Sequence, residues 1–382
     1  MAPRASTHTS EPAAGPLDPR RRVVLCVGPG GVGKTTCAAT LALGAARRGL
    51  KVLVVTIDPS RRLAQALGFG PHTPPGAELV IPTPELAAPG SLHALLLDGK
   101  VVFDRLVRAY AGSEEAAATV LRNPIYKATA EHLGGALEYA AIAQLQFLHD
   151  EGRHDLLVLD TPPTANAIDF LAAPDRIQEL VTNPALRLLT GTGKLGARVL
   201  GIGNGIVLKV LATMGGGAFV EDLGEFLREF SGVLQAFREH AGDFHDLLTS
   251  PATGVVLTTS ASQFSVREAL SFLEILHRRS MRVDAVVLNR LLPMFEAAPP
   301  VEAVRAELVR QRGDQDSEAE LAALLAAHAG IRIQGERSRE AITALTAAYP
   351  KIPVWALPRR EPPPNSLPEL RELGEQFVKV AG

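Results

Sequence analysis

The feature that most constrains this chain is a glycine-rich turn that joins an apolar run to a helical pattern. The run Val23–Val27 is typical of a parallel strand buried on both faces. The turn that follows, GPGGVGKT at 28–35, matches G-x-x-x-x-G-K-[ST], and a helix is predicted from Lys34 to about Arg48. Inward-facing N–H groups and a helix N-terminus cradle phosphate, so the unit predicts a nucleotide site.

Further apolar runs alternate with helical patterns along the chain. KVLVVTI ends just before Asp58 and LLVL just before Asp160, and later runs lie at 254–258, 285–288 and 352–357. This alternation predicts an α/β fold, a doubly wound and mostly parallel sheet. Ligands bind beyond the carboxyl ends of such strands, so Asp58 and Asp160 should face the phosphates.

Two stretches interrupt this alternation. Residues 99–149 and 184–248 have helical periodicity and predict an α-helical subdomain inserted into a domain over 22–382. The glycine-rich part at 199–220 fits either a surface for an apolar client or a buried helix pair. Residues 1–21 predict a disordered leader, and residues 367–380 predict a terminal helix.

Charge and cysteine content exclude several classes of protein. The chain has 39 basic and 41 acidic residues among 382, a net charge of −2, which argues against a nucleic-acid-coating function. Cys26 and Cys37 are too few for a disulfide scaffold or for a four-cysteine zinc site within one chain. With no export signal and no apolar run of ~18 residues, we expect a cytoplasmic protein, free or peripheral to the membrane.

Several segments together resemble the ArsA/GET family of dimeric ATPases, in the deviant Walker A class of P-loop proteins. They are GGVGKTT at 30–36, TIDPS at 56–60 and DTPPT at 160–164, and VVLNRLLP at 286–293 is similar to the family's adenine-binding segment. The likeness is nearest to the bacterial anion-transporting-ATPase-like branch. It implies ATP and Mg²⁺ as cofactors, and ATP hydrolysis coupled to dimer closure around a client.

The motif and the resemblance together assign the site residues. The pattern itself predicts that Lys34 contacts the β/γ-phosphates and that the Thr35 hydroxyl binds Mg²⁺. The resemblance implies that Asp58 activates the hydrolytic water, and that Asp58 and Asp160 serve the metal beside Thr35. The implied nucleotide contacts are Gly28, Gly30, Gly31, Val32, Gly33, Lys34, Thr35, Thr36, Asn289 and Pro358.

The chain departs from the family pattern in three ways. Pro29 stands where the family has a lysine that reaches the partner's phosphates, and proline has no side-chain donor or charge. No C-x-x-C pair exists for a dimer zinc clamp. Cys26 and Cys37 do not match the cluster that senses arsenicals, so we interpret them as two buried thiols.

These departures leave alternatives open for the partners. The chain is either a homodimer or one half of a heterodimer with a paralogue, in which it is a catalytically weak binding subunit. The client is a hydrophobic protein or a membrane-associated partner, and no nucleic acid is expected. A ParA/MinD-type positioning ATPase is a further alternative, which the near-neutral charge and the acidic residues at 369–375 disfavour.

Overall fold

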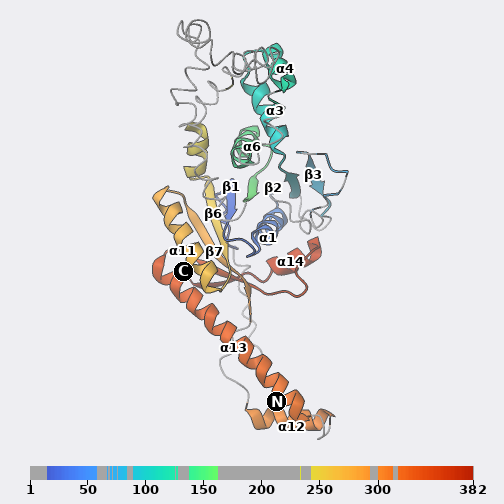
Figure 1. The fold of residues 1–382 in the computed structure, drawn as a ribbon, viewed down its shortest axis with the longest axis vertical. Helices are drawn as coiled ribbons and strands as arrows, with labels where there is room; N and C mark the ends of the chain where they lie inside the picture. Colours follow the sequence, from blue (N-terminus) through green and yellow to red (C-terminus); the bar gives the residue numbers. More distant parts are fainter. Residues whose placement is uncertain are drawn as a thin grey trace, which may run out of the picture.

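The computed structural model describes residues 15–57, 67, 69–70, 72–74, 76–83, 89–124, 126–127, 137–161, 233, 242–292, 300–312 and 317–381. Within these residues one nine-stranded sheet has the order β3-β4-β2-β5-β1-β6-β7-β8-β9 (Figure 1). The strands are β1 (Val23–Val27), β2 (Lys51–Thr56), β3 (Glu78–Ile81), β4 (Ser91–Leu96), β5 (Leu156–Asp160), β6 (Thr253–Thr259), β7 (Val283–Leu291), β8 (Val354–Pro358) and β9 (Val378–Ala381).

The strand pairing confirms the predicted doubly wound α/β fold. Every pair is parallel except β3 with β4 and β8 with β9 at the two edges. The helices are α1 (Lys34–Arg47), α3 (Gly99–Tyr110), α4 (Glu114–Arg122), α6 (Leu137–Glu151), α11 (Gln263–Arg278), α12 (Val301–Arg312), α13 (Ser317–Ala348) and α14 (Leu367–Gly374).

Two hydrophobic cores cover the two faces of the sheet. On one face Val23 and Leu25 of β1 belong to the core that α6 and α11 complete. On the other face Val24 and Cys26 belong to the core formed with α1 and α14. All five residues of β1 and of β5 are buried, which is why these strands read as uninterrupted apolar runs.

The predicted helices at 99–149 are present where the structure describes them. Asp98 and Ser113 accept hydrogen bonds from backbone N–H groups at the starts of α3 and α4. A small separate core joins these two helices to Tyr126 and Val233, the latter from the second predicted helical stretch. Apart from Val233, residues 184–241 lie outside the described residues. Residues 242–249 form a helix that packs against the sheet.

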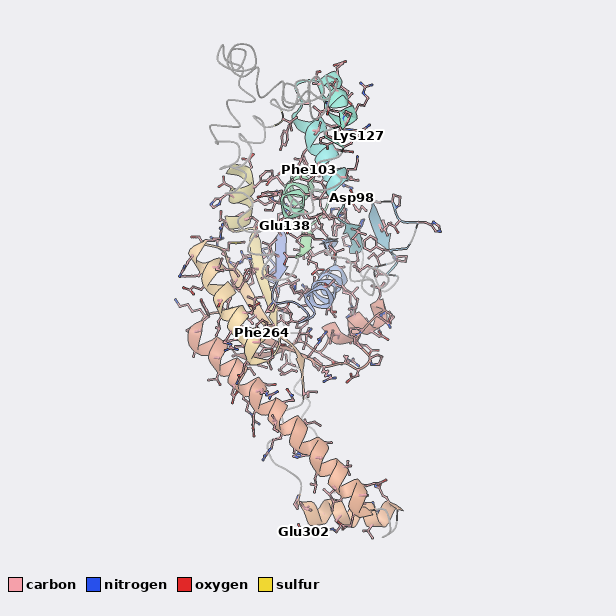
Figure 2. All side chains as sticks on the ribbon, in the orientation of Figure 1. Asp98, Phe103, Lys127, Glu138, Phe264 and Glu302 are labelled. Carbon is pink, nitrogen blue, oxygen red and sulfur yellow. The ribbon has the colours of Figure 1, made fainter. Side chains whose placement is uncertain are left out.

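The long helix α13 and its partner α12 extend away from the sheet (Figure 1). Helix α13 has 32 residues, a length of roughly 48 Å. Figure 2 shows Glu302 on α12 and Lys127 beyond α4 at opposite ends of the molecule. No helix among the described residues is long and apolar enough to span a bilayer.

Two sequence expectations need correction at the chain ends. Leu17 is buried, and Arg21 donates to Asp284 on β7 (Nε–Oδ2 2.9 Å), so residues 17–21 pack on the domain instead of belonging to the leader expected over 1–21. The helix predicted over 367–380 ends at Gly374, and Val378–Ala381 forms β9. The open edge of β8 gives these last residues backbone partners that a helix would forgo.

Candidate functional site

The phosphate loop adopts a conformation that only glycine accommodates easily. Gly28, Gly31 and Gly33 have φ of +149°, +75° and +91°. A Cβ on Gly28 would lie 1.9 Å from the carbonyl oxygen of Thr258, so the loop passes directly against β6. Around Gly31 a Cβ would meet nothing within 4 Å, so this part of the loop faces open space. The loop therefore has one face held by the sheet and one face open to a ligand.

Lys34 is the first residue of α1, and its side chain is directed back over the loop. The residue is buried at 7 % exposure, and its Nζ donates to the Pro29 carbonyl oxygen at 2.9 Å. Helix α1 begins after Gly33 with no acidic residue in its first turn, which leaves the positive end of the helix dipole to an anion. Thr35 and Thr36 follow on this first turn and are half-buried.

Asp160 occupies the end of β5 between the ends of β1 and β2. Its neighbours in register are Cys26 on one side and Thr56 on the other. Asp160 is 2 % exposed, and its Oδ2 accepts a hydrogen bond from Thr56 Oγ1 at 3.1 Å. The next residue, Thr161, donates through Oγ1 to the Cys26 carbonyl at 2.8 Å. These bonds fix a carboxylate at the same sheet edge as the phosphate loop.

Asn289 connects the far side of the loop to β7. Its Nδ2 donates to the Val32 carbonyl oxygen at 2.8 Å, and its Oδ1 accepts from the Arg290 N–H at 2.9 Å. The residue is 5 % exposed. An asparagine amide has two donor hydrogens and two acceptor lone pairs, so these two bonds use one of each. The structure thus gives Asn289 a loop-holding contact that the sequence did not predict.

A cavity of about 500 Å³ begins beside the phosphate loop. Its lining includes Thr36, Asn289 and Pro358, three residues predicted to contact nucleotide from separate parts of the chain. Sequence reasoning missed the other polar residues there, because the long helix α13 and the segment after β8 supply most of them. They include Arg290, Gln334, Arg337, Arg359 and Arg360. The lining is therefore rich in arginine, although Arg359 and Arg360 are paired with Glu361 and Glu372.

The remaining site predictions divide between described and undescribed residues. Gly30 and Gly31 are exposed and Val32 is buried, all within the loop. Asp58 lies outside the described residues, directly after Ile57, the last residue described in this part of the chain. The segment after Thr161 lies outside them as well. The roles implied for Asp58 in catalysis and metal binding therefore remain predictions.

The two thiols match the interpretation as buried residues. Cys26 and Cys37 are free and fully buried on either side of the loop. Burial raises the pKa of the Cys26 thiol well above its ordinary value, and it raises the pKa of Cys37 to about 12. Both side chains are therefore neutral at physiological pH, the form that neither attacks an electrophile nor binds a metal.

Comparison with known proteins identifies the family. The family model described as "Anion-transporting ATPase" matches residues 21–313, which is most of the chain. The chain belongs to this family. The resemblance inferred from the motifs is thereby confirmed, together with the α/β fold of P-loop proteins.

Individual relatives of the anion-transporting ATPase family are distant. An uncharacterised protein of Streptomyces coelicolor is 35 % identical over 47 % of this chain and 42 % of its own length. A putative arsenical pump-driving ATPase of Aquifex aeolicus is 23 % identical over 71 % of this chain and 64 % of its own length. The ATPase GET3 of Malassezia globosa is 25 % identical over 70 % of this chain and 72 % of its own length. The chain thus spans less than two thirds of the length of the Streptomyces and Aquifex proteins.

Proposed function

We propose that this protein is a Mg²⁺-dependent ATPase whose nucleotide state controls dimer closure and client binding. The observation that carries the proposal is the order of groups along one edge of the sheet. Asp160 ends β5, the glycine loop and Lys34 follow the neighbouring strand β1, and the cavity lined by Thr36, Asn289 and Pro358 lies on the other side of the loop, toward β7 and β8. A nucleoside triphosphate has the matching sequence of parts, a polyanionic chain followed by a base.

The residues present fit a magnesium ion beside the phosphates. The Asp160 carboxylate and the Thr35 hydroxyl are hard oxygen donors at the same edge of the sheet. When bound, the ion would neutralise charge on the β- and γ-phosphates. Lys34 would then exchange its bond with the Pro29 carbonyl for one with a phosphate oxygen. Asp58, two residues beyond the end of β2, is placed in sequence to orient the water.

The dimer and the client are supported by separate features. Helices α12 and α13 leave the domain, and they carry the exposed apolar residues Val301, Val309, Leu324 and Ile333. Exposed apolar side chains are candidates for contact with a second chain, and we propose that these helices form part of the dimer surface. The small core of α3, α4 and Val233 supports the inserted helical subdomain, which we propose as the client-binding part.

A second candidate is a binding subunit that hydrolyses ATP weakly. Pro29 favours it, because the residue is buried and its carbonyl is bonded to Lys34, so this position supplies no cation to a partner's phosphates. A positioning ATPase that uses a C-terminal membrane helix is disfavoured, since residues 378–381 form an edge strand.

Measurement of ATP turnover and ATP binding on the full chain tests the proposal. We expect Mg²⁺-dependent phosphate release that falls by roughly 100-fold or more in Lys34→Ala. Lys100→Ala, which changes an exposed lysine on α3, is the matched control. Asp58→Asn should abolish turnover while ATP binding is retained. Equal turnover in the wild type and Lys34→Ala would contradict ATPase activity, and binding without turnover would favour the weak subunit.

A further inference from the structure

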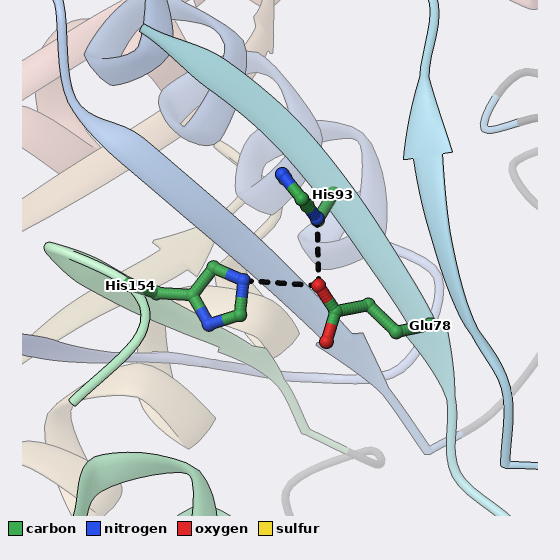
Figure 3. A group of neighbouring side chains, drawn as sticks. All are labelled: Glu78, His93 and His154. Atoms are coloured by element: carbon green, nitrogen blue, oxygen red, sulfur yellow. Dashed lines mark hydrogen bonds and ion pairs between the residues drawn. The ribbon is translucent and has the colours of Figure 1, made fainter. Parts of the chain in front are cut away.

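Glu78, His93 and His154 meet at the edge of the sheet opposite the phosphate loop. Figure 3 shows the Glu78 carboxylate between the two imidazole rings. Its Oε1 lies 2.6 Å from His93 Nδ1 and 3.1 Å from His154 Nε2. One ligand atom from each of the three residues lies within 4.8 Å of the other two. No other such group of three metal-binding side chains occurs among the described residues.

The sheet register brings these residues together. Glu78 on β3 pairs with Leu95 on the antiparallel strand β4, so Glu78 and His93 point to the same face, two residues apart along β4. His154 lies two residues before β5, at the amino-terminal edge of the parallel strands. The phosphate loop follows the carboxyl end of β1, so this cluster is independent of the nucleotide site.

The donor set is the one that zinc uses in proteins. Two imidazole nitrogens and one carboxylate oxygen leave a fourth, open position for water. Zinc–ligand distances of about 2.0–2.2 Å in a tetrahedron place ligand atoms about 3.3 Å apart. Small side-chain shifts therefore suffice to admit an ion. Ser91 Oγ lies 3.1 Å from His93 Nε2, and it can accept a hydrogen bond from the N–H at this ring nitrogen when Nδ1 binds a metal.

Burial and charge suit a cation at this position. His154 is buried, with 6 % of its surface exposed. The side chains of Glu78 and His93 are each 19 % exposed, so the cluster is open to solvent. Arg153, 57 % exposed, lies 3.3 Å from the second oxygen of Glu78 and is a competing cation.

We propose that Glu78, His93 and His154 bind one divalent transition-metal ion, Zn²⁺ or an ion of similar preference. The ligand atoms are a Glu78 carboxylate oxygen, His93 Nδ1 and His154 Nε2. The bound ion fastens the β3–β4 edge to the connection between α6 and β5. It differs from the proposed nucleotide-bound Mg²⁺, because imidazole nitrogen favours zinc whereas Mg²⁺ takes oxygen ligands.

Titration of the metal-free, untagged full chain with Co²⁺ tests this proposal through the visible absorption of tetrahedral cobalt. Nucleotide is left out, and excess Mg²⁺ fills oxygen-only sites. We expect one Co²⁺ per chain, displaced by Zn²⁺. His93→Ala and Glu78→Gln should weaken binding by more than about 100-fold, since loss of second-shell partners alone costs about 10–100-fold. His277→Ala, on the exposed face of α11, should bind as the wild type does.

A surface variant keeps the test informative if the ligand variants fail to fold. Arg153→Ala removes an exposed, competing charge, together with a surface ion pair to Glu151, and should tighten Co²⁺ binding about fivefold. Circular dichroism in EDTA checks that each variant is folded. Absence of tetrahedral cobalt absorption in the wild type would overturn the proposal and leave an ion-paired cluster. Binding that persists in folded His93→Ala would overturn it as well.

Discussion

The side-chain amide of Asn289 holds the phosphate loop by a 2.8 Å hydrogen bond to the carbonyl oxygen of Val32. These residues lie 257 positions apart in the chain, and the bond ties β7 to the loop between β1 and α1. The fit is close, because a Cβ on Gly33 would lie 2.4 Å from the same amide nitrogen. Asn289 therefore positions the loop in addition to lining the cavity.

Replacement of Asn289 by alanine should lower both stability and nucleotide affinity. The Val32 carbonyl would lose its buried donor, at a cost of about 1–3 kcal/mol in the free energy of unfolding. Urea unfolding and ATP titration measure the two effects. Asn365→Ala, at an exposed position after β8, is the control. If Asn289→Ala binds ATP and unfolds as the control does, the loop-holding role is wrong.

Alanine substitutions in the phosphate loop should differ sharply in their effect on stability. Gly28→Ala forces a Cβ against the Thr258 carbonyl and should cost more than about 3 kcal/mol. The Cβ of Gly31→Ala would have no neighbour within 4 Å. This variant should therefore lose only about 1–2 kcal/mol in the free energy of unfolding, the penalty for a left-handed backbone at a residue other than glycine. Urea unfolding of the two variants side by side checks this order, and the reverse order would contradict the described packing against β6.

Burial of Cys37 should make the protein less stable at high pH. The pKa of Cys37 is about 12 in the folded protein, against 9.0 as the ordinary value. Its contribution to stability is complete below pH 9 and is lost as pH rises toward 12, because only the unfolded chain ionises in this window. At pH 10.5 the loss should be about 2 kcal/mol.

The Cys37→Ala variant isolates that contribution. Urea unfolding of the wild type and the variant at pH 8 and pH 10.5 gives the difference between them. We expect the wild type to lose more stability than Cys37→Ala over this interval. The same burial predicts that both thiols of the native protein resist alkylation at pH 8 and react once the chain is unfolded.

Introduction of a lysine at position 29 should raise ATP turnover if a homodimer closes over two nucleotides. A cation that reaches a partner's phosphates stabilises transition-state charge, and such groups contribute orders of magnitude in rate. We expect Pro29→Lys to increase kcat by roughly tenfold or more. Pro29→Ala, which removes the ring without adding charge, should not. An unchanged kcat in an ATP-dependent Pro29→Lys dimer would indicate that another residue already supplies the cation.

Local patterns predicted the parts of the fold that depend on neighbouring residues. Strands β1, β2 and β5 are largely apolar runs, and the glycines of the loop mark a place where positive φ is required. Asp98 and Ser113 cap the starts of α3 and α4 through hydrogen bonds to the backbone N–H three residues later, so these starts also depend on neighbouring residues. Each of these signals lies within one turn or one strand.

The edge strands and the terminal segment could not be predicted in this way. Strands β3 and β4 lack a long apolar run, and β3 is stabilised by pairing with β4. Residues 378–380 have the pattern of a continuing helix, yet β8 offers them hydrogen bonds along an open edge. Pairing partners of this kind are distant in sequence, so no local pattern reports them.

The sequence by itself determined the phosphate loop, the strand that enters it, the helix that leaves it and the acid at the end of β5. These features follow from backbone preferences and burial within short segments. Only the tertiary structure decided which side chains face the loop and its cavity, and that Glu78 and His154, 76 residues apart, approach His93. Strand order and register set these distances, because they place residues by hydrogen bonds between segments rather than by position along the chain.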